Sequence, residues 1–148
     1  MIRSISWPEI HKIWNTELWP NRTSAIEPNS AMLYLNGYDI SNMNQPASFF
    51  GFFWNNQLVG VNSGHKCSDG SYRSRGLWVN KQYRKQGIGT KLLFATIGQA
   101  KLESSVFVWS FPRQTSWATY KRAGFNLTSD WQPSETSEAN AYCRIDIE

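Results

Sequence analysis

The sequence has little cysteine. Cys67 and Cys143 are its only two, and they lie far apart in a chain of 148 residues. Small secreted proteins that rely on disulfides carry a dense set of cysteines, so that class is excluded and we expect two reduced thiols. Long hydrophobic runs are also missing: no run approaches the ~18 apolar residues of a transmembrane helix, and the first residues lack the ~7–15-residue apolar stretch of a signal peptide. We therefore expect a soluble, cytoplasmic protein with no membrane partner.

Acidic side chains are scarcer than basic ones. Fifteen Lys and Arg against eleven Asp and Glu give a formal net charge of +4, which favours an anionic partner without identifying it. Charged residues make up only 18% of the chain, whereas hydrophobic residues make up 41% and aromatic residues 15%. This balance excludes disorder as the main state. The length predicts one domain, 1–148.

The first half of the sequence predicts a strand, a helix and an antiparallel meander. Ser6 and Glu9 have the spacing of a helix capping box, and apolar residues then recur at helical intervals as far as Leu18. Residues 21–46 are rich in Asn, Ser and Pro, with one apolar run, 31–35, that we interpret as a second helix. Strands are predicted over 2–6, 49–54, 58–63 and 72–79.

The second half alternates helices and strands. Helices are predicted over 88–100 and 115–121, and strands over 105–110, 125–129 and 139–147. The whole order indicates an α/β (α+β) fold: a central mixed, mostly antiparallel sheet of six to seven strands flanked by three to four helices.

A glycine-containing basic loop between a strand and a helix is the most informative segment. Gly87 and Gly89 allow close approach of a ligand to the backbone, and the first N–H groups of the following helix carry partial positive charge. This arrangement predicts a diphosphate site. Six of the fifteen basic residues fall within 73–91: Arg73, Arg75, Lys81, Arg84, Lys85 and Lys91.

Other phosphate motifs fit this segment less well. A Walker loop needs Gly-Lys-Ser/Thr, but Gly89 is followed by Thr90 and then Lys91. A dinucleotide fingerprint needs a third glycine where Leu92 stands. Both motifs are therefore rejected.

Two segments together resemble the GCN5-related N-acetyltransferase (GNAT) family. Residues 84–89, Arg-Lys-Gln-Gly-Ile-Gly, are similar to the family's Arg/Gln-x-x-Gly-x-Gly/Ala loop, and 120–125 resembles its second signature, Tyr-x-x-x-Gly-Phe. The resemblance implies a GNAT-like fold in which two parallel central strands, here 72–79 and 106–110, splay apart. It also implies acetyl-coenzyme A as co-substrate, with its pyrophosphate on the N–H groups of 85–90. The cofactor-binding residues that it implies are Leu77, Trp78, Val79, Arg84, Lys85, Gln86, Gly87, Ile88, Gly89 and Thr90.

For catalysis, the resemblance implies that Tyr120 donates a proton to the coenzyme A thiolate, and a backbone N–H near Val79 could bind the oxyanion. Two features depart from the family. Arg113 stands where an Asn commonly contacts the cofactor, although Gln114 could replace it, and the strand 72–78 lacks the Glu that many relatives use. No general base is therefore assigned. Candidates elsewhere in the chain are Glu17, His65, Asp69 and Glu135.

The expected function is transfer of an acetyl group to a primary amine of a small-molecule or peptide acceptor, and relatives often form a homodimer. A non-catalytic acyl-coenzyme A binding or sensing module is the alternative. A nucleic-acid-binding domain is disfavoured because paired glycines at a helix start suit a compact diphosphate. No metal is expected, since His65 and Cys67 have no second pair at zinc spacing. An aromatic acceptor pocket is expected from Trp19, Tyr34, Tyr38 and Trp131.

Overall fold

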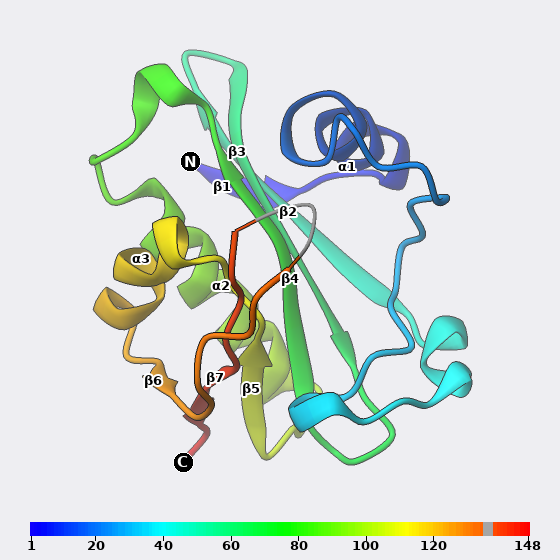
Figure 1. The fold of residues 1–148 in the computed structure, drawn as a ribbon. Helices are drawn as coiled ribbons and strands as arrows, with labels where there is room; N and C mark the ends of the chain where they lie inside the picture. The colour runs from blue at the N-terminus through cyan, green and yellow to red at the C-terminus, as the bar shows by residue number, and fades with distance from the viewer. Residues whose placement is uncertain (135–137) are drawn as a thin grey trace.

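A single mixed sheet organises the computed structural model, which describes residues 1–134 and 138–148 (Figure 1). Within these residues the sheet contains seven strands: β1 (Ile2–Ser4), β2 (Ala47–Trp54), β3 (Gln57–Lys66), β4 (Tyr72–Val79), β5 (Phe107–Ser110), β6 (Asn126–Leu127) and β7 (Cys143–Asp146). The same residues form three α-helices, α1 (Trp7–Ile13), α2 (Ile88–Leu102) and α3 (Trp117–Arg122).

The strand order is β1-β2-β3-β4-β5-β7-β6, and β4 with β5 is the parallel pair. The other neighbouring strands run antiparallel. Strands β4 and β5 pair only where Tyr72 and Arg73 lie opposite Val108 and Trp109. Beyond that point the two strands separate. This arrangement confirms the predicted mixed, mostly antiparallel sheet with splayed central strands.

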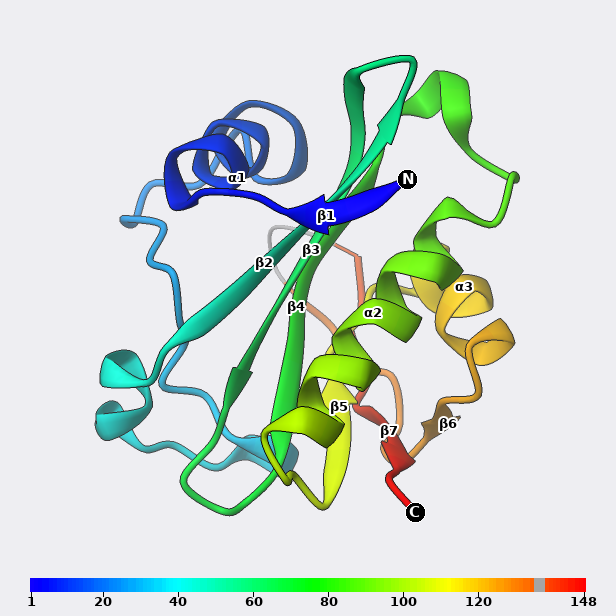
Figure 2. The same cartoon turned by 180° about the vertical axis from the view of Figure 1, so that it is seen from behind.

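The helices cover both faces of the sheet, as Figures 1 and 2 show. On one face α1 packs its buried Ile10 against Val61 of β3. On the other face α2 packs Leu92 against Val59, and α3 lies beside α2. Burial of these apolar side chains fixes the helices and therefore the positions of the loops at the splayed end of the sheet.

Helix α1 begins as its sequence predicts. The Ser6 hydroxyl accepts a hydrogen bond from the Glu9 N–H at 3.2 Å, and the Glu9 carboxylate accepts one from the Ser6 N–H at 2.9 Å. This confirms the capping box. The helix continues as a π-helical turn, Trp14–Leu18, in which the Trp19 N–H donates to the Trp14 carbonyl at 2.7 Å. The turn places Leu18 and Trp19 beside the splayed strands.

A bulge interrupts β4 where the strands begin to part. The register of β3 and β4 shifts there, and Gly76 adopts a left-handed φ of 79°. Its carbonyl accepts a hydrogen bond from the Trp14 indole N–H at 2.9 Å, and the Ser63 hydroxyl donates to the Arg75 carbonyl at 2.7 Å. Side chains therefore satisfy backbone groups that the regular ladder leaves unpaired.

The predicted helix over 31–35 is wrong. Met32 forms a bridge with Tyr38, and Leu35 has a φ of 56°, which a right-handed helix cannot contain. Only a short 3-10 turn, Tyr34–Asn36, occurs there. The Asn36 N–H donates to the Tyr142 hydroxyl at 2.9 Å, so this loop is held against the sheet by tertiary contacts that a local pattern does not show.

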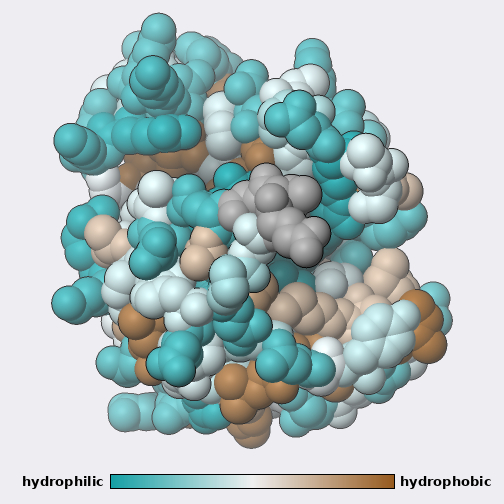
Figure 3. Space-filling model, in the orientation of Figure 1, coloured by the Kyte–Doolittle hydropathy of each residue, from teal (hydrophilic) through white to brown (hydrophobic). Residues whose placement is uncertain are grey.

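The face seen in Figure 3 is mostly hydrophilic, with hydrophobic residues in separate areas. Among the described residues, no helix has both the length and the apolar character needed to cross a bilayer. Both cysteines are free and buried, and the described part of the chain holds no group of three metal-ligating His, Cys, Asp or Glu side chains.

Candidate functional site

The N-terminus of α2 is open to ligands. Gly87 is its N-cap residue, with a φ of 79°, and a Cβ placed there would meet no atom within 4 Å. The Lys91 N–H donates to the Gly87 carbonyl, so the N–H groups of 88–90 precede the first helical hydrogen bond and have no partner inside the helix. Together with the helix dipole, these N–H groups form an anion-binding end.

A cavity of about 610 Å³ surrounds this helix end, between the end of β4, α2 and α3. We call it the cofactor cavity. Nine of the ten predicted cofactor-binding residues line it: Leu77, Trp78, Val79, Arg84, Lys85, Gly87, Ile88, Gly89 and Thr90. Gln86 is exposed and does not line it. The structure thus brings these residues together, while their contact with a cofactor stays a prediction.

The charge of this cavity comes from fewer loop residues than expected. Arg84 and Lys85 line it, and Arg122 of α3 joins them. The Arg84 Nε also donates to the Val79 carbonyl at 2.9 Å, which holds the loop closed. By contrast, Lys91 lies against the Phe52 ring at 5.9 Å, outside the lining. The basic residues of 73–91 are close together in the sequence, but in the folded chain they lie on several different surfaces.

Gly89 also has a packing role, besides the cofactor contact that stays a prediction. It is buried, and a Cβ there would lie 2.8 Å from Thr119 Cγ2 of α3. Glycine at this position therefore permits close packing of α2 and α3, whereas Gly87 provides the open approach to the helix end.

A second cavity, of about 290 Å³, lies between the splayed β4 and β5. We call it the acceptor pocket. Ser74 and Gly76 of β4 face Ser110 of β5 across it, and Trp19 contributes from the segment after α1. Four residues line both cavities: Leu18, Leu77, Arg113 and Ser116. The two cavities are therefore adjacent and share one wall.

Tyr120 lines the acceptor pocket from α3 and is only 3% exposed. Its hydroxyl lies 3.4 Å from the Ser110 Oγ, and Ser110 donates to the Ser74 carbonyl at 2.8 Å. Burial raises the pKa of Tyr120 above its usual range. The phenol therefore keeps its proton at neutral pH and can act as an acid. This placement suits the predicted role, which stays a prediction.

None of the three candidate bases that the structure describes, Glu17, His65 and Asp69, lines the acceptor pocket. Asp69 accepts hydrogen bonds from Ser71 within its own turn. His65 is fully buried, its Nε2 accepts the Ser30 N–H at 3.4 Å, and burial lowers its pKa to about 4. Glu17 lines the cofactor cavity, and Glu135 lies outside the described residues. Among the described residues, no carboxylate or histidine lines the acceptor pocket.

The expected aromatic acceptor pocket is largely wrong. Only Trp19 of the four residues lines the pocket; Tyr34 packs against Trp109, and Tyr38 is 71% exposed. Trp131 does not line it either. Arginines line it instead, namely Arg22, Arg73, Arg75 and Arg113.

Arg113 stands at the position where the family commonly has an Asn, and its contact with a cofactor stays a prediction. Its side chain lines both cavities, whereas Gln114 is exposed and lines neither. The residue that faces the site is thus the arginine and not the neighbouring amide.

The family model described as "Acetyltransferase (GNAT) family" matches residues 5–125. The chain therefore belongs to the GNAT acetyltransferase family. No curated protein sequence matches it.

Solved structures share its fold. An aminoglycoside 6'-N-acetyltransferase complexed with coenzyme A is 12% identical with a TM-score of 0.71, over 99% of this chain and 96% of that chain. The IAA acetyltransferase from Bacillus cereus is 14% identical with a TM-score of 0.70, over 99% of both chains. The ribosomal-protein-alanine N-acetyltransferase from Brucella melitensis is 16% identical with a TM-score of 0.69, over 99% of both chains.

Proposed function

We propose that the protein transfers an acetyl group from acetyl-coenzyme A to a primary amine. One observation carries this proposal: an anion-binding helix end and a pocket containing a buried tyrosine lie on two sides of one wall. A donor with phosphates and an acceptor could therefore be bound at the same time, with their reacting groups near Leu77 and Arg113.

The residues of the cofactor cavity fit coenzyme A. The open N–H groups of 88–90, with Arg84 and Lys85, suit the negative charge of the phosphates. The β4 edge at 77–79 faces the cavity and lies beyond the residues paired with β5, so it can pair with an amide-containing chain. Acetyl-coenzyme A would supply the activated acetyl thioester.

The pocket itself favours a neutral amine. An amine with a pKa of ~10.4 is mostly protonated at pH 7, and removing the proton costs about 4–5 kcal/mol. Positive charges close to an amine lower its pKa because they disfavour the ammonium form. Arg73 and Arg75 line the pocket, and among the described residues no carboxylate lines it with them, so their positive charges reduce this cost.

Tyr120 would supply the proton that the leaving thiolate needs. Its raised pKa means that the phenol is protonated over the whole neutral range. The chain's own residues would therefore meet two requirements of transfer: the arginines favour a neutral amine, and Tyr120 supplies a proton.

Thermal-shift titration with acetyl-coenzyme A tests the donor site. At ~100 times the Kd, binding adds about 2.7 kcal/mol of stability, which raises the melting temperature by ~5–10 °C. Lys85→Glu should weaken binding about tenfold, since it reverses a charge beside the phosphates. Lys101→Glu makes the same charge change at the other end of α2 and should leave binding intact. No shift in the wild-type chain would contradict the assignment.

A thiol-release assay over a panel of amines separates the enzyme from the alternative. Turnover with an amine supports the acetyltransferase. If acetyl-coenzyme A produces a thermal shift but no amine in the panel leads to release of the coenzyme A thiol, the non-catalytic acyl-coenzyme A binding module is favoured. Such a module binds the donor and lacks only the chemical step.

A further inference from the structure

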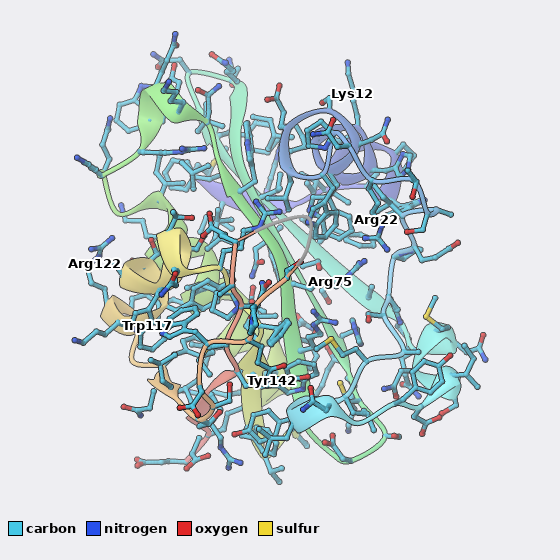
Figure 4. All side chains as sticks on the ribbon, in the orientation of Figure 1. Lys12, Arg22, Arg75, Trp117, Arg122 and Tyr142 are labelled. Atoms are coloured by element: carbon cyan, nitrogen blue, oxygen red, sulfur yellow. The ribbon has the colours of Figure 1, made fainter. Side chains whose placement is uncertain are left out.

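Of the four arginines that line the acceptor pocket, three do not also line the cofactor cavity; we call these three, Arg22, Arg73 and Arg75, the arginine cluster. Arg73 and Arg75 are two positions apart on β4, so their side chains leave the strand on the same side. Arg22 comes from the segment after the π-helical turn, and Figure 4 shows Arg22 and Arg75 directed toward the same region of the molecule. Arg75 is only 5% exposed, whereas Arg22 is exposed.

Aromatic rings hold the two strand arginines in place. The Arg75 guanidinium carbon lies 5.0 Å from the Trp14 ring centroid and 5.2 Å from that of Trp19, and Arg73 lies 4.9 Å from Trp109. A guanidinium fixed over a ring still presents its N–H edge to a ligand. The Arg75 Nη1 donates to a backbone carbonyl, that of Glu27, at 2.9 Å, which fixes the side chain without neutralising it.

Among the described residues the arginine cluster forms no salt bridge, and the Glu27 carboxylate acts on Arg75 only at longer range. No carboxylate lines the pocket, and the ion pair within the described residues joins Arg144 to Asp146, elsewhere. The Arg73 Nε is buried with no hydrogen-bond partner. Burial, with Arg73 and Arg22 nearby, lowers the pKa of Arg75. Buried unpaired cations are costly, so this arrangement suits an anion that arrives with a ligand.

The anion in question is not part of the donor. The cofactor cavity has its own cations, Arg84, Lys85 and Arg122, and shares Arg113 with the acceptor pocket, whereas none of the arginine cluster lines it. The cluster lines the other cavity, beside Tyr120. The two groups of cations are therefore assigned to two different ligands.

We propose that the acceptor is a small primary amine that also carries an oxyanion, a carboxylate or a phosphate, bound by the arginine cluster. This inference rests on the proposed function. The guanidinium fork matches both oxyanions in two-point hydrogen bonding. The pocket volume of about 290 Å³ corresponds to about ten water volumes of ~30 Å³ each, so it suits a molecule of about ten non-hydrogen atoms.

Matched acceptor pairs test the proposal in the full chain at saturating acetyl-coenzyme A. The pairs are glycine with glycinamide, β-alanine with its amide, and phosphoethanolamine with ethanolamine. In at least one pair, the oxyanionic member should have a kcat/KM higher by about tenfold or more, the effect of one charged hydrogen bond. The amide's amine is the weaker base and loses its proton more easily, so reactivity alone favours the neutral member. Preference for the neutral member in every pair overturns the proposal, and the pair with the larger ratio identifies the oxyanion.

Variants of the arginine cluster then test whether these arginines cause the preference for the oxyanionic amine. Arg22→Gln removes an exposed charge and leaves the buried packing intact, and Arg75→Lys keeps the charge but loses the fork. Each should raise KM about tenfold for the oxyanionic amine and leave KM for its neutral partner unchanged. Arg3→Gln on β1, where Arg3 lies over the Phe53 ring, is the control. An equal change for both members of a pair overturns the proposal.

The two proposals fail in different ways. If acetyl-coenzyme A produces neither a thermal shift nor thiol release, the proposed function fails. If it binds and neutral amines turn over faster, only the acceptor assignment fails. If it binds without turnover, the same pairs are titrated calorimetrically into the chain saturated with coenzyme A. Tighter binding of an oxyanionic member then supports the assignment, and equal or undetectable binding overturns it.

Discussion

Tyr120 combines a buried side chain with a hydroxyl that borders the acceptor pocket. Its ring meets Phe125 edge-on at 5.4 Å, which fixes the phenol, and Ser110 is its polar neighbour at 3.4 Å. The phenol is protonated at neutral pH and so has a proton to donate, while its raised pKa makes it a weaker acid than a solvent-exposed tyrosine.

Tyr120→Phe should therefore slow thiol release by about 10²–10⁴-fold, the usual contribution of a general acid. The thermal shift with acetyl-coenzyme A should remain, because the phosphate contacts lie at α2. Tyr72→Phe is a matched control: Tyr72 is also buried and donates to Glu103 at 2.9 Å, but it lines neither cavity. An equal loss of rate in both variants would contradict the role of Tyr120.

At the scale of the elements, the bulge in β4 determines where the site opens. The extra residue releases the strand from its regular pairing, and Gly76 passes under the Trp14 indole. The π-helical turn after α1 meets β4 at this point. The acceptor pocket therefore depends on a contact between two elements that are far apart in the sequence.

Gly76→Ala tests this contact. A Cβ there would overlap the Trp14 ring, and φ is 79°, so we expect a loss of about 2–4 kcal/mol in the free energy of unfolding. Gly98→Ala in α2 is the control, because nothing lies within 4 Å of its Cβ and helix propensity should stabilise it by up to about 1 kcal/mol. Urea unfolding measures both. Equal stability of Gly76→Ala and wild type would show that the contact is unimportant.

The phosphate loop could be predicted because its signal is local. Glycines, basic residues and a helix start occur in one run, and the fold keeps that run together around the cofactor cavity. The position of Arg73 and Arg75 in the acceptor pocket could not be predicted in this way. Both precede the loop on the same strand, but a strand rises ~3.3 Å per residue, which carries them away from the loop to the point where β4 and β5 part.

The aromatic prediction failed for a related reason. Tyr34 belongs to a loop that folds onto Trp109 and Tyr142, and its conformation depends on a left-handed Leu35 that no local pattern favours. Residues 21–46 reach their positions through long-range contacts such as Asn29 to the Asn42 carbonyl at 2.8 Å. Periodicity in the sequence predicts individual helices and strands. The acceptor pocket lies between such elements, so its lining depends on contacts that periodicity does not predict.

At the scale of the whole molecule, the buried His65 makes stability depend on pH. Burial, with Arg73 nearby, lowers its pKa from 6.5 to about 4, so the folded state holds it neutral. Between these values the unfolded chain binds a proton that the folded chain does not, and folding is weakened as pH falls. The full effect is present above pH 6.5 and is lost progressively toward pH 4.

We therefore expect the free energy of unfolding to fall by about 3 kcal/mol from this residue between pH 6.5 and pH 4. His65→Gln should flatten that part of the pH profile. His11→Gln on α1 retains the buried histidine and should keep the slope. Denaturant titrations at several pH values measure it, and an unchanged profile in His65→Gln would assign the pH dependence to other groups.

Arg113 stands in the wall that the two cavities share. Two negatively charged ligands, one in each cavity, would draw on this single cation while also repelling each other. The affinity of each ligand is then a function of whether the other is present, and thermodynamic linkage requires the two affinities to change by the same factor. Arg113 would therefore contribute to coupling between donor and acceptor, and the Asn usual at this position in the family would lack its charge.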